Sequence, residues 1–275
     1  ACALAARKRL TLITGGPGTG KTTTVVRILA LLQSCARREG REIRLALAAP
    51  TGKAAARLGA SIASAIDQLP LEMRPPNVCT AVTLHKLLQI RPDQVDAASP
   101  ALAVDLVIVD EASMIDLEMM ARLLAAVPRT AFLILLGDKD QLASVEAGAV
   151  MAQLCEDAVM GAYTPQTTAW IQAVTGCNLS AFAGNGNMLA QQTVMLRRSH
   201  RVAGAIGQLA LAVNAGNADE ATALLAHAHA GGDLVCLTGG HSRGADAELL
   251  SRLMAVAVAG YGDCLRTMAQ GPGPV

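Results

Sequence analysis

The sequence predicts an α/β fold in which a parallel sheet carries helices on both faces. Three short runs, 10–14, 45–49 and 104–109, are nearly continuous in apolar residues rather than alternating, which is typical of strands buried on both faces. The first two runs each lead through a turn of small residues into a segment with helical spacing. Strand–helix–strand units of this kind favour a parallel sheet, because the crossover between parallel strands is usually a helix.

The composition sets the scale and the class of the molecule. The 275 residues are 52% hydrophobic, which is enough for one large domain or two modest domains with a substantial core. No apolar run approaches the length of a membrane span, and the N-terminus lacks the pattern of a secretory signal. The chain begins with Ala1 rather than methionine, in what resembles the middle of a helix, so we expect a piece of a longer protein.

Cysteines, charges and aromatic residues narrow the class further. Seven cysteines without a C-x-x-C pair indicate reduced thiols in a cytoplasmic protein and argue against a disulfide framework or a zinc site. The net charge of +1 gives no general electrostatic argument for nucleic acid as a partner. Aromatic residues make up only 2% of the chain, which leaves few rings for the base stacking that many single-strand binders use.

The first predicted strand leads into a phosphate-binding loop. Residues 15–22, GGPGTGKT, fit the pattern G-x-x-x-x-G-K-[ST] and stand between that strand and a helix predicted over 23–34. Glycines let the backbone curl so that several N–H groups face one anion, and the helix adds the positive end of its dipole. The residues predicted to bind the nucleotide are Gly15, Gly16, Pro17, Gly18, Thr19, Gly20, Lys21, Thr22 and Thr23.

Two side chains of this loop have a predicted role of their own. Lys21 adds a positive charge near the β and γ phosphates, and the hydroxyl of Thr22 can ligate Mg²⁺. The loop therefore predicts a nucleoside triphosphate and Mg²⁺ as ligands.

The strand predicted over 104–109 ends in two carboxylates, Asp110 and Glu111. Open α/β sheets bind ligands outside the carboxyl ends of their strands, so these carboxylates would meet the phosphate-binding loop there. Asp110 is predicted to hold Mg²⁺ through water, and Glu111 to orient or deprotonate the attacking water. The alternative is a core strand that merely ends in two acids.

The strand predicted over 131–136 delivers Gln141 to the same edge of the sheet. An amide supplies both a hydrogen-bond donor and an acceptor, which suits a residue that senses a γ-phosphate or a neighbouring water. A polar turn in which Asp138 caps a helix is the simpler alternative.

The turn after the strand at 45–49 carries small and basic residues. Thr51, Lys53 and Arg57 suit contact with a phosphodiester backbone. An ordinary turn, in which Thr51 caps the helix predicted over 54–68, explains the same residues equally well.

The region between this helix and the carboxylates is less regular. We expect Thr83 to cap a helical element over 83–88. The segment 90–103 contains two prolines and is expected to be irregular or a small hairpin, and it is a weak candidate for a strand-separating pin.

Taken in order, these motifs resemble superfamily 1 helicases, and more narrowly the RecD family, the α subunits of bacterial exodeoxyribonuclease V. The resemblance extends to about Asn217 and includes the beginning of a second motor lobe, in LRRSHR and IGQLALAVN at 196–201 and 206–214. The first lobe is represented by GGPGTGKTTT at 15–24, APTGKAAARL at 49–58, TLHKLL at 83–88, VDEASMIDLEMM at 109–120 and GDKDQLASVEAGAV at 137–150.

The resemblance implies an ATP-dependent DNA helicase that moves 5′ to 3′ on single-stranded DNA, beside RecB- and RecC-like subunits, in double-strand break repair and recombination. In such an enzyme Gln141 would couple the γ-phosphate to the DNA-binding face, and Arg201 would reach the γ-phosphate from the second lobe. The implied catalytic residues are Lys21, Glu111, Gln141 and Arg201, the Mg²⁺ ligands are Thr22 and Asp110, and the contacts to the DNA backbone are Thr51, Lys53, Thr83 and His85.

The resemblance also implies the domain organisation. We expect a first P-loop NTPase (RecA-like) domain over 1–162, a variable linking segment over 163–190 and an incomplete second RecA-like domain over 191–275. Within the last, 248–259 has the pattern of an amphipathic helix.

Two departures from the family pattern qualify these expectations. A glutamine-bearing adenine motif should precede Ala1, and the later motifs of the second lobe do not appear before Val275. For residues 1–275 alone we therefore expect nucleotide binding with weak or absent hydrolysis and no unwinding. A P-loop module that orders a partner interface without translocation is the alternative function, although a pure binder needs neither Glu111 nor Gln141.

Overall fold

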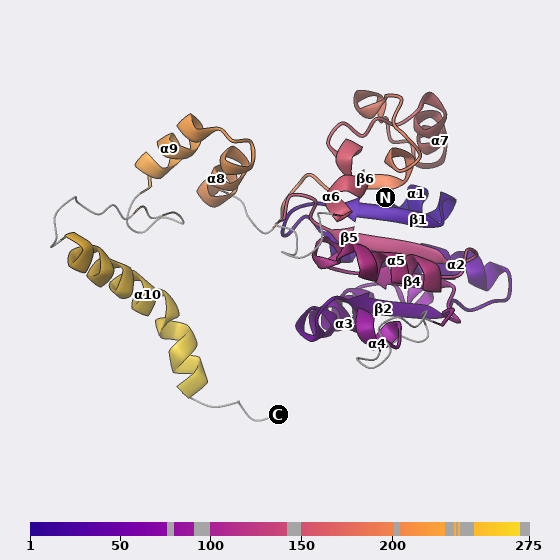
Figure 1. The fold of residues 1–275 in the computed structure, drawn as a ribbon, viewed down its shortest axis with the longest axis horizontal. Helices are drawn as coiled ribbons and strands as arrows, with labels where there is room; N and C mark the ends of the chain where they lie inside the picture. Colours follow the sequence, from indigo (N-terminus) through magenta and orange to yellow (C-terminus); the bar gives the residue numbers. More distant parts are fainter. Residues whose placement is uncertain are drawn as a thin grey trace. The chain divides into compact units, whose positions relative to one another are not determined.

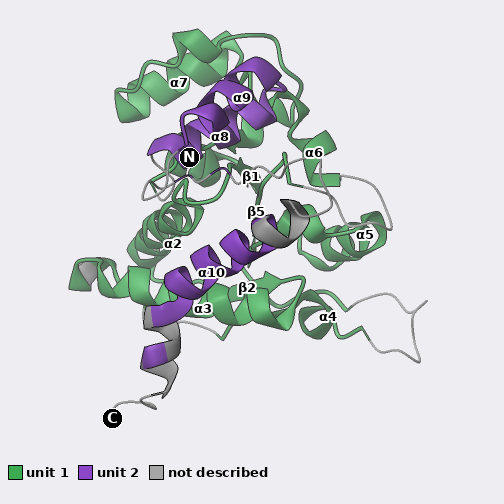
Figure 2. Cartoon of the chain, turned by 90° about the vertical axis from the view of Figure 1, so that its left-hand side faces the viewer, with its two compact units in different colours: residues 1–202 green, residues 203–275 purple. Residues whose placement is uncertain are grey.

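The computed structural model describes residues 1–75, 80–90, 100–141, 150–200, 204–228, 234, 236 and 245–269. The chain divides into two compact units, Ala1–Val202 and Ala203–Val275, which are drawn in two colours in Figure 2. Each unit is described by itself.

A parallel sheet forms the centre of the first unit. Its strands are β1 (Leu10–Thr14), β2 (Leu45–Ala49), β3 (Val82–Thr83), β4 (Leu106–Val109), β5 (Phe132–Gly137) and β6 (Thr193–Met195). Their order is β3-β2-β4-β5-β1-β6, and every pairing among these described strands is parallel (Figure 1). The predicted α/β fold is confirmed, and the predicted bounds of β1 and β2 are correct.

Helices cover both faces of this sheet, because successive strand residues point to opposite sides. Leu12 packs in one core cluster and Ile13 in the other. The first cluster includes α4 (Leu84–Leu87), α5 (Leu117–Ala126) and α6 (Val150–Leu154). The second includes α1 (Cys2–Arg7), α2 (Lys21–Arg38) and α3 (Gly52–Asp67). Because both faces are buried, the strands need continuous apolar runs, as the sequence indicated.

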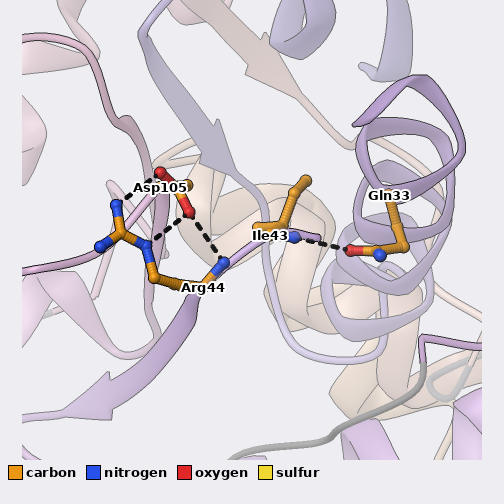
Figure 3. Close-up of polar contacts among 4 residues, drawn as sticks. All are labelled: Gln33, Ile43, Arg44 and Asp105. Carbon is orange, nitrogen blue, oxygen red and sulfur yellow. Dashed lines mark hydrogen bonds and ion pairs between the residues drawn. The ribbon is translucent and has the colours of Figure 1, made fainter. Parts of the chain in front are cut away.

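A charged pair fixes the starts of β2 and β4 beside each other (Figure 3). The backbone N–H and Nε of Arg44 both donate to Oδ2 of Asp105 at 2.9 Å, and a terminal guanidinium nitrogen donates to Oδ1 at 3.0 Å. Asp105 N–H donates in return to the Arg44 carbonyl at 2.9 Å. Figure 3 also shows the neighbouring bond from Ile43 N–H to Oε1 of Gln33, which joins this turn to α2.

Substitution of Asp105 by asparagine should cost stability near neutral pH but not in strong acid. The hydrogen bonds from Arg44 lower the pKa of Asp105 to about 2. A lowered folded-state pKa adds stability above the unfolded pKa of about 4, and that stability is lost as the pH falls toward 2. Since Arg44 is 64% exposed, the loss at pH 7 should be below about 1 kcal/mol.

Urea unfolding of wild type and Asp105→Asn between pH 2 and 7 checks this expectation. Asp67→Asn is the matched control, because Asp67 is 78% exposed and its ion pair with Arg74 spans 3.9 Å. A difference between wild type and Asp105→Asn that stays constant down to pH 2 would contradict the assignment.

The segment before β6 belongs to the first unit rather than to a linker. It contains α7 (Pro165–Thr175), and the hydroxyl of Tyr163 donates to the Thr193 carbonyl at 2.7 Å. β6 itself pairs with β1, with Thr193 opposite Leu12. The predicted boundaries at 162/163 and 190/191 therefore do not coincide with the observed division at 202/203. A three-residue strand gives too short a pattern to be found from sequence.

The described part of the second unit contains the helices α8 (Gly204–Asn214), α9 (Ala218–Ala226) and α10 (Ala245–Ala269). Oδ1 of Asn217 caps α9 by accepting from the Glu220 N–H at 3.2 Å. The helix predicted over 248–259 lies within α10. That this unit begins a second RecA-like lobe stays a prediction.

Short 3-10 helices complete the described elements. They are η1 (Leu71–Met73), η2 (Ala112–Met114), η3 (Glu156–Ala158), η4 (Ser180–Phe182) and η5 (Ala190–Gln192). None of the described helices combines the length and the apolar character that a membrane crossing requires. Most of the proposed pin segment, 91–99, lies outside the described residues.

Candidate functional site

A cavity of about 950 Å³ lies at the carboxyl ends of the central strands in the first unit. It is formed by the loop after β1, the carboxylates after β4, the turn after β5 and one side of α3. Its lining residues are Pro17, Gly18, Thr19, Gly20, Lys21, Thr22, Thr23, Arg57, Ala60, Ser61, Ser64, Ala65, Gln68, Asp110, Glu111, Asp138, Gln141 and His200.

The loop between β1 and α2 has the conformation that its glycines permit. Gly18 and Gly20 have φ values of 73° and 86°, in the left-handed region that residues other than glycine rarely adopt. The hydroxyl of Thr19 donates to the Gly16 carbonyl at 2.8 Å and closes the turn. The N-terminus of the 18-residue helix α2 follows directly, so its free N–H groups and dipole favour an anion at this place.

The ammonium of Lys21 lies over the loop. Its Nζ donates to the carbonyls of Gly15 and Gly16 at 2.5 and 3.2 Å. Carbonyl oxygens are weaker partners for an ammonium than phosphate oxygens, because hydrogen bonds between two charged groups are stronger. Lys21 is therefore held where an incoming phosphate can take over its hydrogen bonds.

Thr14, at the end of β1, connects the loop to both neighbouring strands. Its buried hydroxyl accepts from the Lys139 N–H at 2.9 Å, beyond the end of β5. Its carbonyl accepts from the Leu196 N–H at 2.8 Å, just after β6. A Cβ on Gly15 would come within 2.6 Å of the Leu196 carbonyl oxygen, so only glycine allows this close approach.

The segment after β6 holds the outer side of the loop. The hydroxyl of Ser199 donates to the Pro17 carbonyl at 3.0 Å, and the His200 N–H donates to the Gly18 carbonyl at 2.8 Å. Sequence reasoning did not assign these residues to the nucleotide site. Ser199 and Pro17 are 182 positions apart, and no local pattern links them.

Asp110 and Glu111 stand at the end of β4, as predicted. The Asp110 N–H donates a hydrogen bond of 3.0 Å to the Ala48 carbonyl, on the neighbouring strand β2. Glu111 has a φ of 53°, an uncommon left-handed conformation for a non-glycine residue, and its N–H donates to Oδ1 of Asp110 at 2.9 Å. Both carboxylates line the cavity that also contains Lys21.

Burial raises the pKa of Asp110, while the hydrogen bond from Glu111 N–H and the positive charges of Lys21 and Arg57 oppose the shift. A carboxylate whose charge is penalised by burial gains from a nearby cation. Carboxylate and hydroxyl oxygens are the ligands that Mg²⁺ prefers, and Thr22 lines the same cavity. Asp110 and Thr22 therefore fit the requirements of a magnesium site.

Gln141 lines the cavity from the turn after β5. Its Oε1 accepts a hydrogen bond of 2.8 Å from the hydroxyl of Ser113, on η2. Ser113 was not singled out from sequence, although it stands two residues after Glu111. Asp138 accepts from the Asp140 N–H at 3.1 Å and so shapes this turn, but no described helix follows it directly.

One side of α3 forms a wall of the cavity. Its lining residues recur at helical spacing, namely Arg57, Ala60, Ser61, Ser64 and Ala65, and Gln68 lines the cavity directly after the helix. From the sequence, Arg57 was grouped with Thr51 and Lys53 as a residue that suits contact with a phosphodiester backbone. In the structure it lines the cavity. The spacing along the helix could have indicated this, because a residue six positions after the cap faces a different direction from the cap.

The four residues predicted to contact DNA lie at a neighbouring edge and do not line the cavity. Thr51 caps α3 by accepting from the Ala54 N–H at 3.2 Å, and Thr83 caps α4 by accepting from the Lys86 N–H at 3.3 Å. β2 and β3 pair with Ala49 opposite Thr83, so both caps stand at adjacent strand ends. Lys53 and His85 are exposed beside them. The capping interpretation of Thr51 is confirmed.

Arg201, the predicted arginine of the second lobe, lies outside the described residues.

The family of the chain follows from comparison with known proteins. The family model described as an AAA domain matches residues 1–147, which include the phosphate-binding loop, both carboxylates and Gln141. The chain belongs to the AAA domain family.

Individual relatives agree with the predicted resemblance to RecD. The chain is 45% identical over 239 residues to the RecBCD enzyme subunit RecD of Mycolicibacterium smegmatis, covering 85% of this chain and 37% of that protein. It is 38% identical over 242 residues to the RecBCD enzyme subunit RecD of Haemophilus influenzae, covering 82% and 36%. It is 40% identical over 152 residues to the ATP-dependent RecD2 DNA helicase of Deinococcus radiodurans, covering 54% and 18%.

These matches confirm the resemblance to RecD that the motifs predicted. The chain spans little more than a third of the length of the RecD subunits it matches.

Proposed function

We propose that this chain is the nucleotide-binding part of an ATP-dependent DNA helicase of the RecD type. The observation that carries the proposal is the meeting of Lys21, Asp110, Glu111 and Gln141 in one cavity, beside the N-terminus of α2. Phosphoryl transfer to water requires four such groups. They are a cation for the phosphates, a carboxylate for a metal, a second carboxylate for the attacking water and an amide for the γ-phosphate. The similarity to RecD and RecD2 proteins supports the same reading.

ATP would bind with its β and γ phosphates on the backbone N–H groups of the loop. Lys21 would exchange the carbonyls of Gly15 and Gly16 for phosphate oxygens and so stabilise the charge that develops in the transition state. Mg²⁺, held by Thr22 and by Asp110 through water, would neutralise phosphate charge. Glu111 would orient the attacking water and accept its proton.

Single-stranded DNA would run along the edge formed by Thr51, Lys53, Thr83 and His85. Contacts there would be to the phosphodiester backbone, because Lys53 and His85 are exposed donors and few aromatic residues are available. The edge is one strand away from the carboxylates, since β2 pairs with both β3 and β4. The loss of the γ-phosphate would therefore change the affinity of this edge for single-stranded DNA.

The finer assignments rest on the resemblance to RecD. They are 5′ to 3′ movement, a γ-phosphate contact from Arg201, association with RecB- and RecC-like subunits, action in double-strand break repair and recombination, and a cytoplasmic location.

The proposal predicts that single-stranded DNA stimulates ATP hydrolysis by the full-length protein by about tenfold or more, a difference of ~1.4 kcal/mol in the barrier. Steady-state hydrolysis with and without an oligonucleotide measures this directly. A nucleotide-binding module that orders a partner interface would hydrolyse ATP at the same slow rate in both conditions, and that result would overturn the proposal.

A further inference from the structure

Ser113 makes a hydrogen bond that the roles described so far do not use. Its hydroxyl donates to Oε1 of Gln141 at 2.8 Å, although the two residues are 28 positions apart. Ser113 is only 6% exposed, whereas Gln141 lines the cavity. The bond therefore joins a fixed, buried group to a group that faces the nucleotide site.

The backbone holds Ser113 firmly in this place. The Met114 N–H donates to the Glu111 carbonyl at 3.0 Å, which closes the turn that contains Ser113. On the other side, a Cβ on Gly137 would come within 3.0 Å of the Ser113 nitrogen, so the end of β5 packs directly against this turn. Ser113 thus belongs to the same backbone turn as Glu111.

In the arrangement present, the bond leaves one end of the Gln141 amide available to a ligand. An amide has an oxygen that only accepts and an NH₂ group that only donates. Because the hydroxyl of Ser113 occupies Oε1, the NH₂ group is the end left for another partner. Ionised phosphate oxygens only accept hydrogen bonds, so they can bind the NH₂ end and are repelled by the oxygen.

We propose that Ser113 is a positioning residue that keeps the NH₂ end of Gln141 turned toward the γ-phosphate. Without this hydrogen bond, the terminal torsion of glutamine is broad and roughly two-fold, so the amide would also adopt the unproductive orientation. The inference rests on the proposed function, because it assumes a γ-phosphate in the cavity. It also links the amide that contacts the phosphate to the turn that carries Glu111.

A double-mutant cycle in the full-length protein tests this role. Ser113→Ala should lower DNA-stimulated kcat for ATP hydrolysis about fivefold, the size expected for the loss of one hydrogen bond. The Kd for ADP should stay within about twofold, because ADP has no γ-phosphate, and Ser113→Thr should restore the rate. In a Gln141→Ala background, Ser113→Ala should have no further effect on kcat.

Thermal unfolding of each variant identifies a loss of rate that comes from loss of folding. Ser34→Ala is the matched control, because the Ser34 hydroxyl also donates a hydrogen bond, to the Ala30 carbonyl at 2.7 Å, and it does not line the cavity. An equal effect of Ser113→Ala in the wild-type and Gln141→Ala backgrounds would overturn the positioning role alone. A wild-type protein without DNA-stimulated hydrolysis would overturn the proposed function and this inference with it.

Discussion

Replacement of Lys21 by alanine should lower ATP hydrolysis by the full-length protein by about 10²- to 10³-fold, the usual cost of removing one group that stabilises transition-state charge. Lys21 is the cation of the cavity that lies directly over the phosphate-binding loop, with Nζ 2.5 Å from the Gly15 carbonyl oxygen. Its removal leaves the loop backbone and the helix dipole as the remaining partners of the phosphates. Nucleotide affinity should therefore fall as well.

Steady-state hydrolysis and a fluorescent-nucleotide titration measure these two effects. Lys8→Ala is a suitable control, because Lys8 follows α1 and does not line the cavity. If Lys21→Ala hydrolyses ATP at a rate close to that of Lys8→Ala, the loop does not hold the reacting phosphates.

Replacement of Glu111 by glutamine should separate hydrolysis from binding. Glutamine has nearly the same shape but cannot accept the proton of the attacking water, so kcat should fall by about 10²-fold or more. The nucleotide should still bind, because the loop residues and Asp110 are unchanged. A single-turnover measurement with excess enzyme, together with the Kd for ATP, checks both parts of this expectation.

Glu118→Gln is the matched control for Glu111→Gln. Glu118 lies on α5 in the same part of the chain, and its ion pair with Arg122 at 2.8 Å is on the surface, with Glu118 70% exposed. Equal single-turnover rates for the two variants would remove Glu111 from the catalytic step.

The parts of this structure that the sequence predicted correctly are those with a local cause. β1 and β2 are mostly apolar runs between polar turns, and strands buried on both faces have such runs. The phosphate-binding loop is also local, since its glycines, Lys21 and the start of α2 lie within ten residues of each other. Asp110 and Glu111 followed from their position at the end of a buried strand.

The parts that were missed depend on contacts between distant residues. β6 has three residues, and it is a strand because β1 offers it a free edge. Ser199 and His200 reach the loop only through the position of β6, and Ser113 reaches Gln141 only because β4 and β5 are neighbours. That Arg57 lines the cavity was not predicted, because its distance from the cap was not converted into a direction around the helix.

The central claim is that the nucleotide bound in this cavity controls the affinity for single-stranded DNA at the neighbouring edge of the sheet. The most direct test uses the full-length Glu111→Gln variant, which should bind ATP without hydrolysing it and so allow an equilibrium measurement. Its affinity for a single-stranded oligonucleotide should differ by about tenfold between saturating ATP and saturating ADP, equivalent to ~1.4 kcal/mol of coupling. Equal affinities in the two nucleotide states would contradict the claim.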